Sequence, residues 1–327
     1  MRRQINLRAY LIVVMLCLPF ILSSCIQERL FHTKESNNQI QGVFFQPWEN
    51  YLEEDRYNWN DIFKHLAEEN INQIIIQWTQ YGNTNLLQDE SRGNLIDDII
   101  VSAKRYHIKI IFGLYEDPEY FKKIQSDRTN ISTYLNGLQR KSITIANQII
   151  ELYGNDSVIA GFYISQEIDN INWQSANKIE ELTNYLSVLS TEINAISTPY
   201  PIYISGFYNL DTPIQQYVLM WKQILQNVPI TVLMQNGVGA NSIPSSVCVD
   251  YFNAFYHSLP PDQWGIIAEV FVEDKKEADK FIQANPDDIQ ENITEYKSQF
   301  KDIPIFLFSL TYLTRNNYQL LKAVSHR

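Results

Sequence analysis

Short hydrophobic runs alternate with longer amphipathic stretches along most of the chain. The runs are rich in Ile, Val, Phe and Tyr, and most are continuously apolar, which is typical of parallel strands buried on both faces. Eight runs occur, at 42–47, 73–78, 108–114, 158–164, 202–207, 230–234, 265–271 and 303–308. Between them, apolar residues recur three and four positions apart, as at Ile96, Ile99 and Ile100, and we expect helices there.

The spacing of the runs predicts a closed barrel. Successive runs begin roughly 30 to 50 residues apart, which suits one strand followed by one helix. Eight such units match the usual size of a (β/α)8 barrel. An open, doubly wound sheet is the alternative, but the even spacing favours closure, and no GxGxxG motif follows the first run. We therefore predict a single α/β domain, a (β/α)8 TIM barrel, over residues 40–327.

The first residues have the pattern of an export signal. Three Arg and no acidic residue lie within residues 1–8, and residues 10–22 are almost wholly apolar but too few to span a membrane comfortably. Residues 22–25 read LSSC, which resembles a bacterial lipobox. The resemblance implies a lipoprotein signal peptide at 1–24 and a lipidated Cys25, with palmitate among its acyl chains. An ordinary cleaved signal with an accidental Cys is the alternative.

A tether and a location follow from this interpretation. Residues 25–39 are mostly polar and lack periodicity, so we expect the lipidated Cys25 and a flexible segment ahead of the barrel. We predict a protein of the cell envelope, attached to the membrane only through the anchor on Cys25. Ile26, rather than Asp, follows that Cys, which favours the outer membrane, facing the periplasm or the cell surface.

Composition excludes several classes of function. The chain has 26 Lys and Arg against 37 Asp and Glu, a net charge of -11, so we expect no nucleic-acid partner. Three Cys are too few for a disulfide scaffold. The five His form neither HxH nor HExxH, so we predict no metal site, and we expect no cofactor. Nothing in the pattern predicts an oligomeric state.

Polar and aromatic residues cluster where the predicted strands end. In TIM barrels these ends and the loops after them build the active site. Trp and Tyr rings stack on sugar rings, and amides and carboxylates hydrogen-bond hydroxyls in both senses. The near absence of Arg and Lys argues against phosphate or carboxylate substrates. We therefore predict a site for a neutral oligo- or polysaccharide. The candidate substrate-binding residues are Gln46, Trp48, Gln77, Trp78, Tyr81, Tyr115, Glu116, Gln166, Asp169, Tyr208, Gln235, Asn236 and Tyr312.

Two glutamates are candidates for catalysis. Glu167 follows the run GFYISQ and Glu269 follows WGIIA, so each projects from a strand end. Glycosidic cleavage requires paired carboxyl groups, one to protonate the leaving oxygen and one to attack or to activate water. Their surroundings must separate the two pKa values. Strands four and seven lie on opposite arcs of the ring, so the two groups can face each other. The alternative is that the two glutamates are solvated rim residues or pair with backbone donors.

Two other features at strand ends have structural explanations as well. Glu116 and Asp117 could bind a sugar or a cation, or could be solvated loop acids. Gly237 and Gly239 lie in a loop without a following Lys, so we expect them to serve a turn with positive φ rather than a phosphate site.

Four motifs carry a family resemblance. They are GVFFQPW at 42–48, IIIQWTQY at 74–81, GFYISQEID at 161–169 and QNGVGA at 235–240. They resemble bacterial exported proteins catalogued as domain of unknown function 4434, which are grouped with glycoside-hydrolase-like barrels. More distantly, the chain resembles the retaining glycosidase clan with catalytic Glu on strands four and seven. The resemblance implies that Glu167 is the acid/base and Glu269 the nucleophile. The chain departs from that clan at Gln166, where the clan has Asn.

The sequence therefore predicts a retaining β-glycoside hydrolase that acts on an envelope or extracellular polysaccharide. A glycan-binding lipoprotein without activity and a scaffold of an exopolysaccharide system are the alternatives.

Overall fold

The computed structural model describes residues 39–48, 58–88, 95–154, 156–196, 199–240, 243–274, 276–277 and 280–325. The predicted signal peptide, the lipidated Cys25 and most of the tether lie outside these residues. Residues Asn38–Arg327 form one compact unit. Within the described part, no helix has both the length and the apolar character that crossing a bilayer requires.

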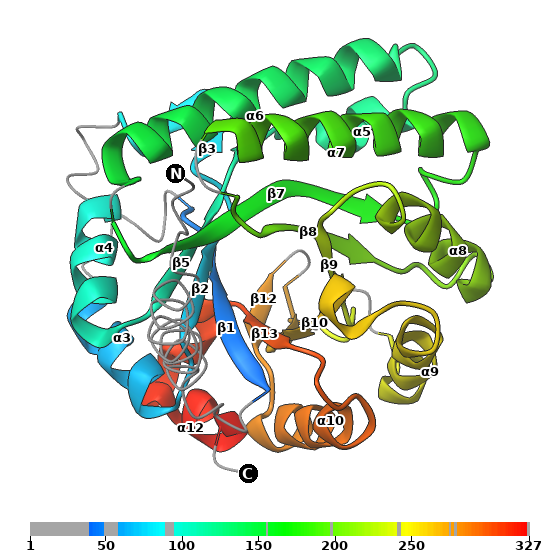
Figure 1. Cartoon of the computed structure of the whole chain (residues 1–327). Coiled ribbons are helices and arrows are strands. Elements are labelled where there is room, and N and C mark those ends of the chain that lie inside the picture. The colour runs from blue at the N-terminus through cyan, green and yellow to red at the C-terminus, as the bar shows by residue number, and fades with distance from the viewer. Residues whose placement is uncertain are drawn as a thin grey trace, which may run out of the picture. The chain divides into compact units, whose positions relative to one another are not determined.

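Eight parallel strands close into a barrel, as the sequence predicts (Figure 1). β1 pairs with β2 on one side and with β13 on the other, which completes the ring. The other neighbours follow chain order around it. The barrel strands are β1 (Ile40–Phe45), β2 (Gln73–Ile76), β5 (Lys109–Gly113), β7 (Ile159–Asp169), β8 (Ile202–Phe207), β9 (Thr231–Gln235), β10 (Trp264–Glu269) and β13 (Ile305–Phe308).

Helices surround the barrel and cover the outer face of its strands (Figure 1). Ile96, Ile99 and Ile100 are buried, as their spacing predicts. Asn58, Asn130 and Asn285 cap helices by accepting a backbone N–H with the side chain. The helices are α3 (Trp59–Glu68), α4 (Leu95–Tyr106), α5 (Tyr120–Gln125), α6 (Ile131–Tyr153), α7 (Ala176–Ile196), α8 (Ile214–Leu225), α9 (Ser245–Tyr256), α10 (Pro286–Gln299), α11 (Leu310–Leu313) and α12 (Gln319–Ser325), with 3-10 turns η2 (Pro261–Gln263) and η3 (Arg315–Tyr318).

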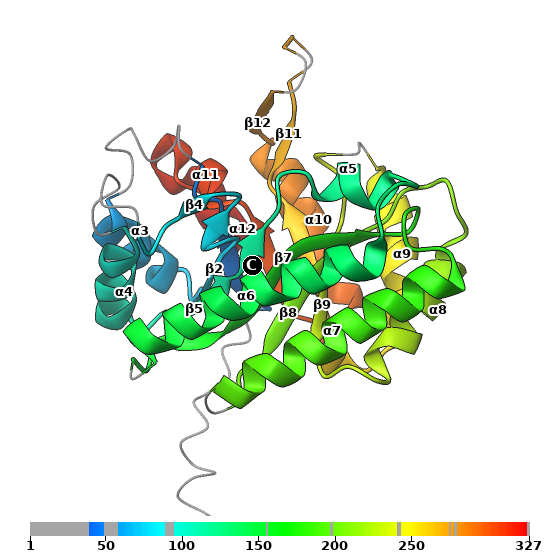
Figure 2. The ribbon, with the colours of Figure 1, turned by 90° about the horizontal axis from the view of Figure 1, so that it is seen from above.

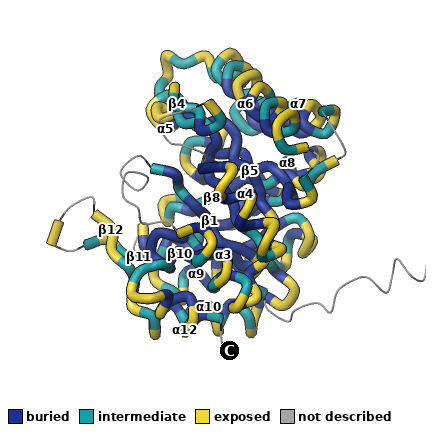
Figure 3. The backbone as a smooth tube through the Cα atoms, turned by 90° about the vertical axis from the view of Figure 1, so that its left-hand side faces the viewer, coloured by how far each residue is buried: buried dark blue, intermediate teal, exposed yellow. Residues whose placement is uncertain are grey.

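The strands are buried on both faces (Figure 3). One hydrophobic cluster draws its members from seven of the eight barrel strands, among them Phe44, Ile111 and Phe306. A second, larger cluster includes residues of both the strands and the helices. This double burial explains why the runs in the sequence are continuous rather than alternating.

Two small sheets supplement the barrel, and the hydrophobic pattern does not predict them. β3 (Gln80–Tyr81), β4 (Thr84–Asn85) and β6 (Tyr115–Glu116) form one sheet. β11 (Phe271–Glu273) and β12 (Phe281–Gln283) form an antiparallel hairpin that projects from the barrel (Figure 2). The run at 265–271 therefore belongs to two elements, because β10 ends at Glu269. Strands of two or three residues are too short to have a recognisable period.

Candidate active site

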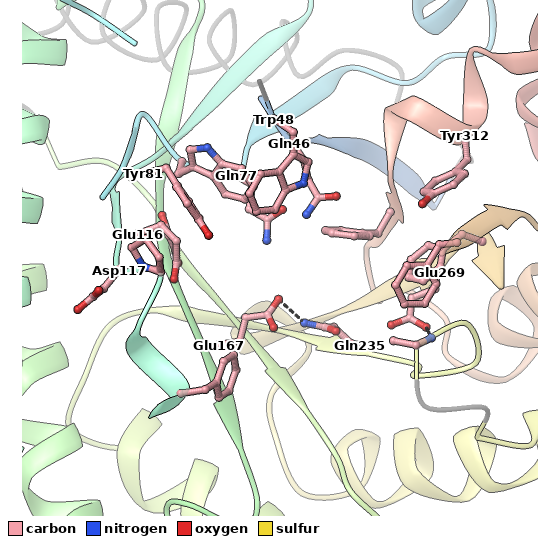
Figure 4. Close-up of a pocket in the computed structure, with 18 residues that line it drawn as sticks. Gln46, Trp48, Gln77, Tyr81, Glu116, Asp117, Glu167, Gln235, Glu269 and Tyr312 are labelled. Carbon is pink, nitrogen blue, oxygen red and sulfur yellow. Dashed lines mark hydrogen bonds between the residues drawn. The ribbon is translucent and has the colours of Figure 1, made fainter. Parts of the chain in front are cut away.

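A pocket of about 510 Å³ lies where the barrel strands end (Figure 4). It contains both predicted catalytic residues and eight of the predicted substrate-binding residues. These ten residues are Gln46, Trp48, Gln77, Trp78, Tyr81, Glu116, Glu167, Gln235, Glu269 and Tyr312. They come from segments that lie far apart in the sequence, and only the closed barrel brings them together.

Glu167 reaches the pocket because β7 contains a bulge. Ile164 pairs with Ile204, and the next partner, Ser205, pairs with Glu167, so two residues are inserted in β7. Gln235 Nε2 donates a hydrogen bond of 2.8 Å to Glu167 Oε1 (Figure 4). Burial raises the pKa of Glu167 to about 7, the charge of Glu269 adds to this, and the bond from Gln235 opposes it. Glu167 can therefore hold a proton near neutral pH.

Glu269 is the last residue of β10 and is only 2% exposed. Its Oε2 accepts backbone N–H groups from Gly239 at 2.6 Å and from Ala240 at 3.0 Å. Burial raises the pKa of Glu269, while these two bonds act to lower it because they stabilise the ionised form. The bonds also hold the carboxyl group in one orientation. Glu269 is thus the more firmly positioned of the two carboxyl groups.

The loop 235–240 supplies those N–H groups, and its two glycines have different functions. Gly237 has a φ of +66°, as we expect from its place in a turn. The same expectation is wrong for Gly239, which is not among the glycines with positive φ. A Cβ atom on Gly239 would lie 2.3 Å from the carbonyl oxygen of Phe271. Gly239 is therefore required by the close approach of the hairpin strand β11.

Aromatic side chains form two walls. On one side, the ring centroid of Trp48 lies 4.7 Å from that of Trp78 and 5.0 Å from that of Tyr81. On the other side, Phe271 stacks on Tyr312 with centroids 5.3 Å apart. Flat, apolar walls of this kind suit the C–H faces of a sugar ring.

Two further carboxyl groups line the pocket next to Tyr81. Burial, followed by the nearby charges of Glu167 and Asp117, raises the pKa of Glu116 well above its ordinary value. Burial also acts to raise the pKa of Asp117, but hydrogen bonds from Lys123, the Glu119 backbone and Tyr134 lower it overall. Asp117 is thus held as an anion by its own neighbours, whereas Glu116 is not.

Five predicted binding residues do not line the pocket. Gln166, inside the bulge, is 1% exposed, donates to the carbonyl of Tyr115 and accepts from Tyr185. The hydroxyl of Tyr115 accepts a hydrogen bond from Lys141. The side chain of Gln166 is therefore engaged within the protein rather than directed into the pocket.

The other three residues serve the structure around the pocket. Asp169 accepts the backbone N–H groups of the turn that follows it. Tyr208 stacks on Tyr217 and Tyr251. Asn236 lies behind Glu269, whose backbone N–H donates to Asn236 Oδ1 at 3.2 Å. The prediction that these five side chains contact substrate has no support from their positions.

Sequence reasoning missed part of the lining. The missed residues are Pro118, Phe121, Ser165, Ala240, Phe271, Phe281 and Phe308, whereas Asp117 is among the acids that the sequence offers as ligands of a sugar or a cation. Two of them, Phe271 and Phe281, flank a charged segment at 273–280, and this arrangement is a usable signal for a hairpin. Among the described residues, no group of three or more His, Cys, Asp or Glu is placed to hold a metal ion.

Solved structures with the same architecture include glycoside hydrolases. A putative α-L-fucosidase from Bacteroides thetaiotaomicron has a TM-score of 0.67 and 16% identity, over 88% of this chain and 92% of that chain. A β-galactosidase from G. stearothermophilus has a TM-score of 0.60 and 8% identity, over 89% and 56%. A β-glucanase from Saccharophagus degradans has a TM-score of 0.53 and 15% identity, over 83% and 79%. The protein therefore shares the (β/α)8 barrel fold of these enzymes.

The family is defined by sequence. The model of the family described as Domain of unknown function (DUF4434) matches residues 40–302, and the chain belongs to this family, as its motifs indicate. The uncharacterized protein YbcH of Escherichia coli (strain K12) is 28% identical over 283 residues, which are 84% of this chain and 90% of that protein.

Proposed function

We propose that the protein is a retaining β-glycoside hydrolase, with Glu167 as general acid/base and Glu269 as nucleophile. The observation that carries the proposal is the difference between the two carboxyl groups in one pocket. Glu167 has a pKa of about 7 and accepts a hydrogen bond from Gln235, whereas backbone N–H groups orient Glu269. This is the division of roles that glycosidic cleavage requires.

The proposed reaction has two steps. Glu269 attacks the anomeric carbon while Glu167 donates its proton to the leaving oxygen, which breaks the glycosidic bond and forms a glycosyl ester on Glu269. Water then attacks the same carbon, Glu167 takes up its proton, and the ester bond to Glu269 breaks. The aromatic walls hold the sugar, and the two N–H groups on Glu269 fix its direction of attack.

Azide rescue of alanine variants tests the two roles separately. Activity on a panel of aryl β-glycosides should fall about 10³-fold or more in Glu269→Ala and in Glu167→Ala. Azide should restore turnover and yield an α-glycosyl azide from Glu269→Ala, but a β-glycosyl azide from Glu167→Ala, as read by NMR. Glu119→Gln, at an exposed acid outside the pocket, is the matched control and should retain activity.

Wild-type rates in both alanine variants would contradict the proposal. Sugar binding by a wild-type protein that releases no product would instead favour a glycan-binding lipoprotein. Capture of a protein partner by the variant that carries both Glu167→Ala and Glu269→Ala would favour a scaffold of an exopolysaccharide system.

We also propose that the protein is anchored in the cell envelope through Cys25, on the strength of the LSSC motif alone. Labelling of cells with radioactive palmitate should mark the wild-type protein but not Cys25→Ser. Equal labelling of the two would contradict the anchor.

A further inference from the structure

Two carboxyl groups in the pocket, those of Glu116 and Asp117, have no function in the proposed mechanism. Glu116 is the last residue of β6 and lies across the pocket from Glu269 (Figure 4). Its side chain has no hydrogen-bond or ion-pair partner within the described part of the chain. Asp117 beside it is already engaged, by Lys123 Nζ at 2.8 Å and the Tyr134 hydroxyl at 2.9 Å. Glu116 is therefore the acid that is available to a ligand.

Two buried polar side chains at the same pocket also lack a partner. Gln77 is 7% exposed and its Oε1 accepts no hydrogen bond from the described residues, and Ser165 is 2% exposed and its hydroxyl makes none with them. Both residues line the pocket, and the amide of Gln77 points into it (Figure 4). Buried polar atoms are nearly always hydrogen-bonded, so these atoms indicate a position that a polar ligand group fills.

Among the described residues, the acidic and basic side chains that line the pocket are all acidic. Glu116, Asp117, Glu167 and Glu269 line it, and no Lys, Arg or His is among the described residues that line it. Lys123 compensates Asp117 from outside the lining. The ionised form of Glu116, which burial disfavours, would be stabilised by a cation bound beside it, so this lining favours a positively charged ligand.

An aromatic cluster adjoins Glu116. Tyr81 lies close enough that the charge of Glu116 contributes, after burial, to the raised pKa of the Tyr81 hydroxyl. Trp48 and Trp78 pack around Tyr81. Aromatic faces stack on sugars and also attract organic cations, so acid and rings together favour a sugar that carries a positive charge.

We infer that the Glu116 end of the pocket is a subsite for an amino sugar with a free ammonium group, held by Glu116, Gln77, Ser165 and the aromatic cluster. The substrate would then be a polysaccharide with de-N-acetylated residues rather than a neutral one. The identification of the ligand as a saccharide rests on the proposed function. An ammonium group offers three donors and a charge, whereas a hydroxyl offers one donor and no charge.

Calorimetry with two matched ligands tests the subsite. We compare a β-1,4-linked glucosamine tetramer with its fully N-acetylated counterpart at pH 6, where most glucosamine amines are protonated. The wild-type protein should bind the glucosamine tetramer about tenfold or more tightly, as a charge-assisted hydrogen bond predicts. Glu116→Gln, which keeps the shape of the side chain, should lose this preference and leave binding of the acetylated tetramer within about twofold.

Glu119→Gln is the matched control, because Glu119 lies on the same loop, is exposed and does not line the pocket. It should retain the wild-type preference. Equal thermal midpoints of the variants, measured by circular dichroism, show that a loss of binding does not reflect a loss of folding.

Three outcomes would overturn the inference. The first is that the wild type binds the two tetramers equally tightly. The second is that Glu116→Gln loses affinity for both tetramers to the same extent. The third is that the wild type binds an oligolysine of the same charge more tightly than the glucosamine tetramer. Mass spectrometry of the recovered ligand separates the two proposals. Tight binding of an intact glucosamine tetramer supports the subsite against the hydrolase, whereas cleavage of both tetramers without preference supports the hydrolase against the subsite.

Discussion

At the scale of single residues, the two candidate catalytic carboxyl groups differ in what stabilises their ionised forms. Glu167 accepts a side-chain amide that a substitution can remove, whereas Glu269 accepts backbone N–H groups that depend on the path of a loop. A substitution of Gln235 can therefore change the pKa of Glu167 directly. The hydrogen bonds to Glu269 can be changed only by a substitution that moves the backbone of the loop containing Gly239.

Replacing Gln235 by Met should raise the pKa of Glu167 above about 7, because the hydrogen bond from Gln235 favours the carboxylate. Glu167 has to be protonated in the first step, so the alkaline limb of the rate profile should move to higher pH. The measurement is kcat/KM against pH for an aryl glycoside. An alkaline limb that stays in place or moves to lower pH would contradict the role of Glu167 as the acid.

Gly239→Ala should destabilise the fold by about 1–3 kcal/mol, because its Cβ meets the Phe271 carbonyl. It should also lower activity by displacing the N–H that Glu269 accepts. Gly137→Ala is the control, since Gly137 lies inside α6 with nothing within 4 Å of the new Cβ, and there we expect a gain of up to about 1 kcal/mol. Denaturant unfolding measures both. A neutral Gly239→Ala would show that the hairpin moves away without cost.

At the scale of elements, the hairpin of β11 and β12 adds an apolar wall to a pocket that the barrel alone leaves open. Phe281 and Ile282 are adjacent on β12 and equally exposed, at 38%, but only Phe281 lines the pocket. Substituting each residue in turn therefore shows whether a change in binding comes from losing a contact in the pocket or from losing exposed apolar surface in general.

Phe281→Ser should weaken the binding of a saccharide long enough to reach the hairpin by about 1 kcal/mol or more, because a stacking face is lost. Ile282→Ser should leave binding unchanged. Both substitutions should alter the free energy of unfolding little, since both side chains are partly in water. Calorimetric titration with oligosaccharides of increasing length provides the comparison. Equal weakening by the two variants would argue against a sugar contact at Phe281.

The elements also show which parts of the site could be predicted. The eight strands are buried on both faces, and such runs are recognisable without knowledge of the fold. The bulge in β7 could not be predicted from the hydrophobic pattern, because it inserts two residues and so leaves the alternation of sides unchanged. That alternation, counted from Tyr163 in the interior cluster, places Ser165 and Glu167 inward and Gln166 outward. For this reason Ser165 lines the pocket and Gln166 does not.

At the scale of the whole molecule, the pocket places several carboxyl groups in an environment that disfavours their charge. Burial raises the pKa of Glu116, Glu167 and Glu269, so each is more easily protonated in the folded than in the unfolded protein. By linkage, such groups stabilise the fold at low pH, and this stabilisation is lost as the pH rises.

The free energy of unfolding should therefore contain a term that declines between about pH 4.5 and pH 7, from the unfolded to the folded pKa of Glu167. Glu167→Gln removes that term, and its stability should decline less over the same range than that of the wild type. Urea unfolding at several pH values measures the difference. A steeper decline in the variant would contradict the raised pKa.

The pairing of β1 with β13 has a consequence for synthesis. These two strands come from opposite ends of the barrel sequence, so one edge of β1 stays without its neighbour until the last strand has emerged. Gln46 and Tyr312, which meet at the pocket only across this seam, cannot hold a sugar between them in a nascent chain. The pocket is therefore incomplete until β13 and α11 have been synthesised.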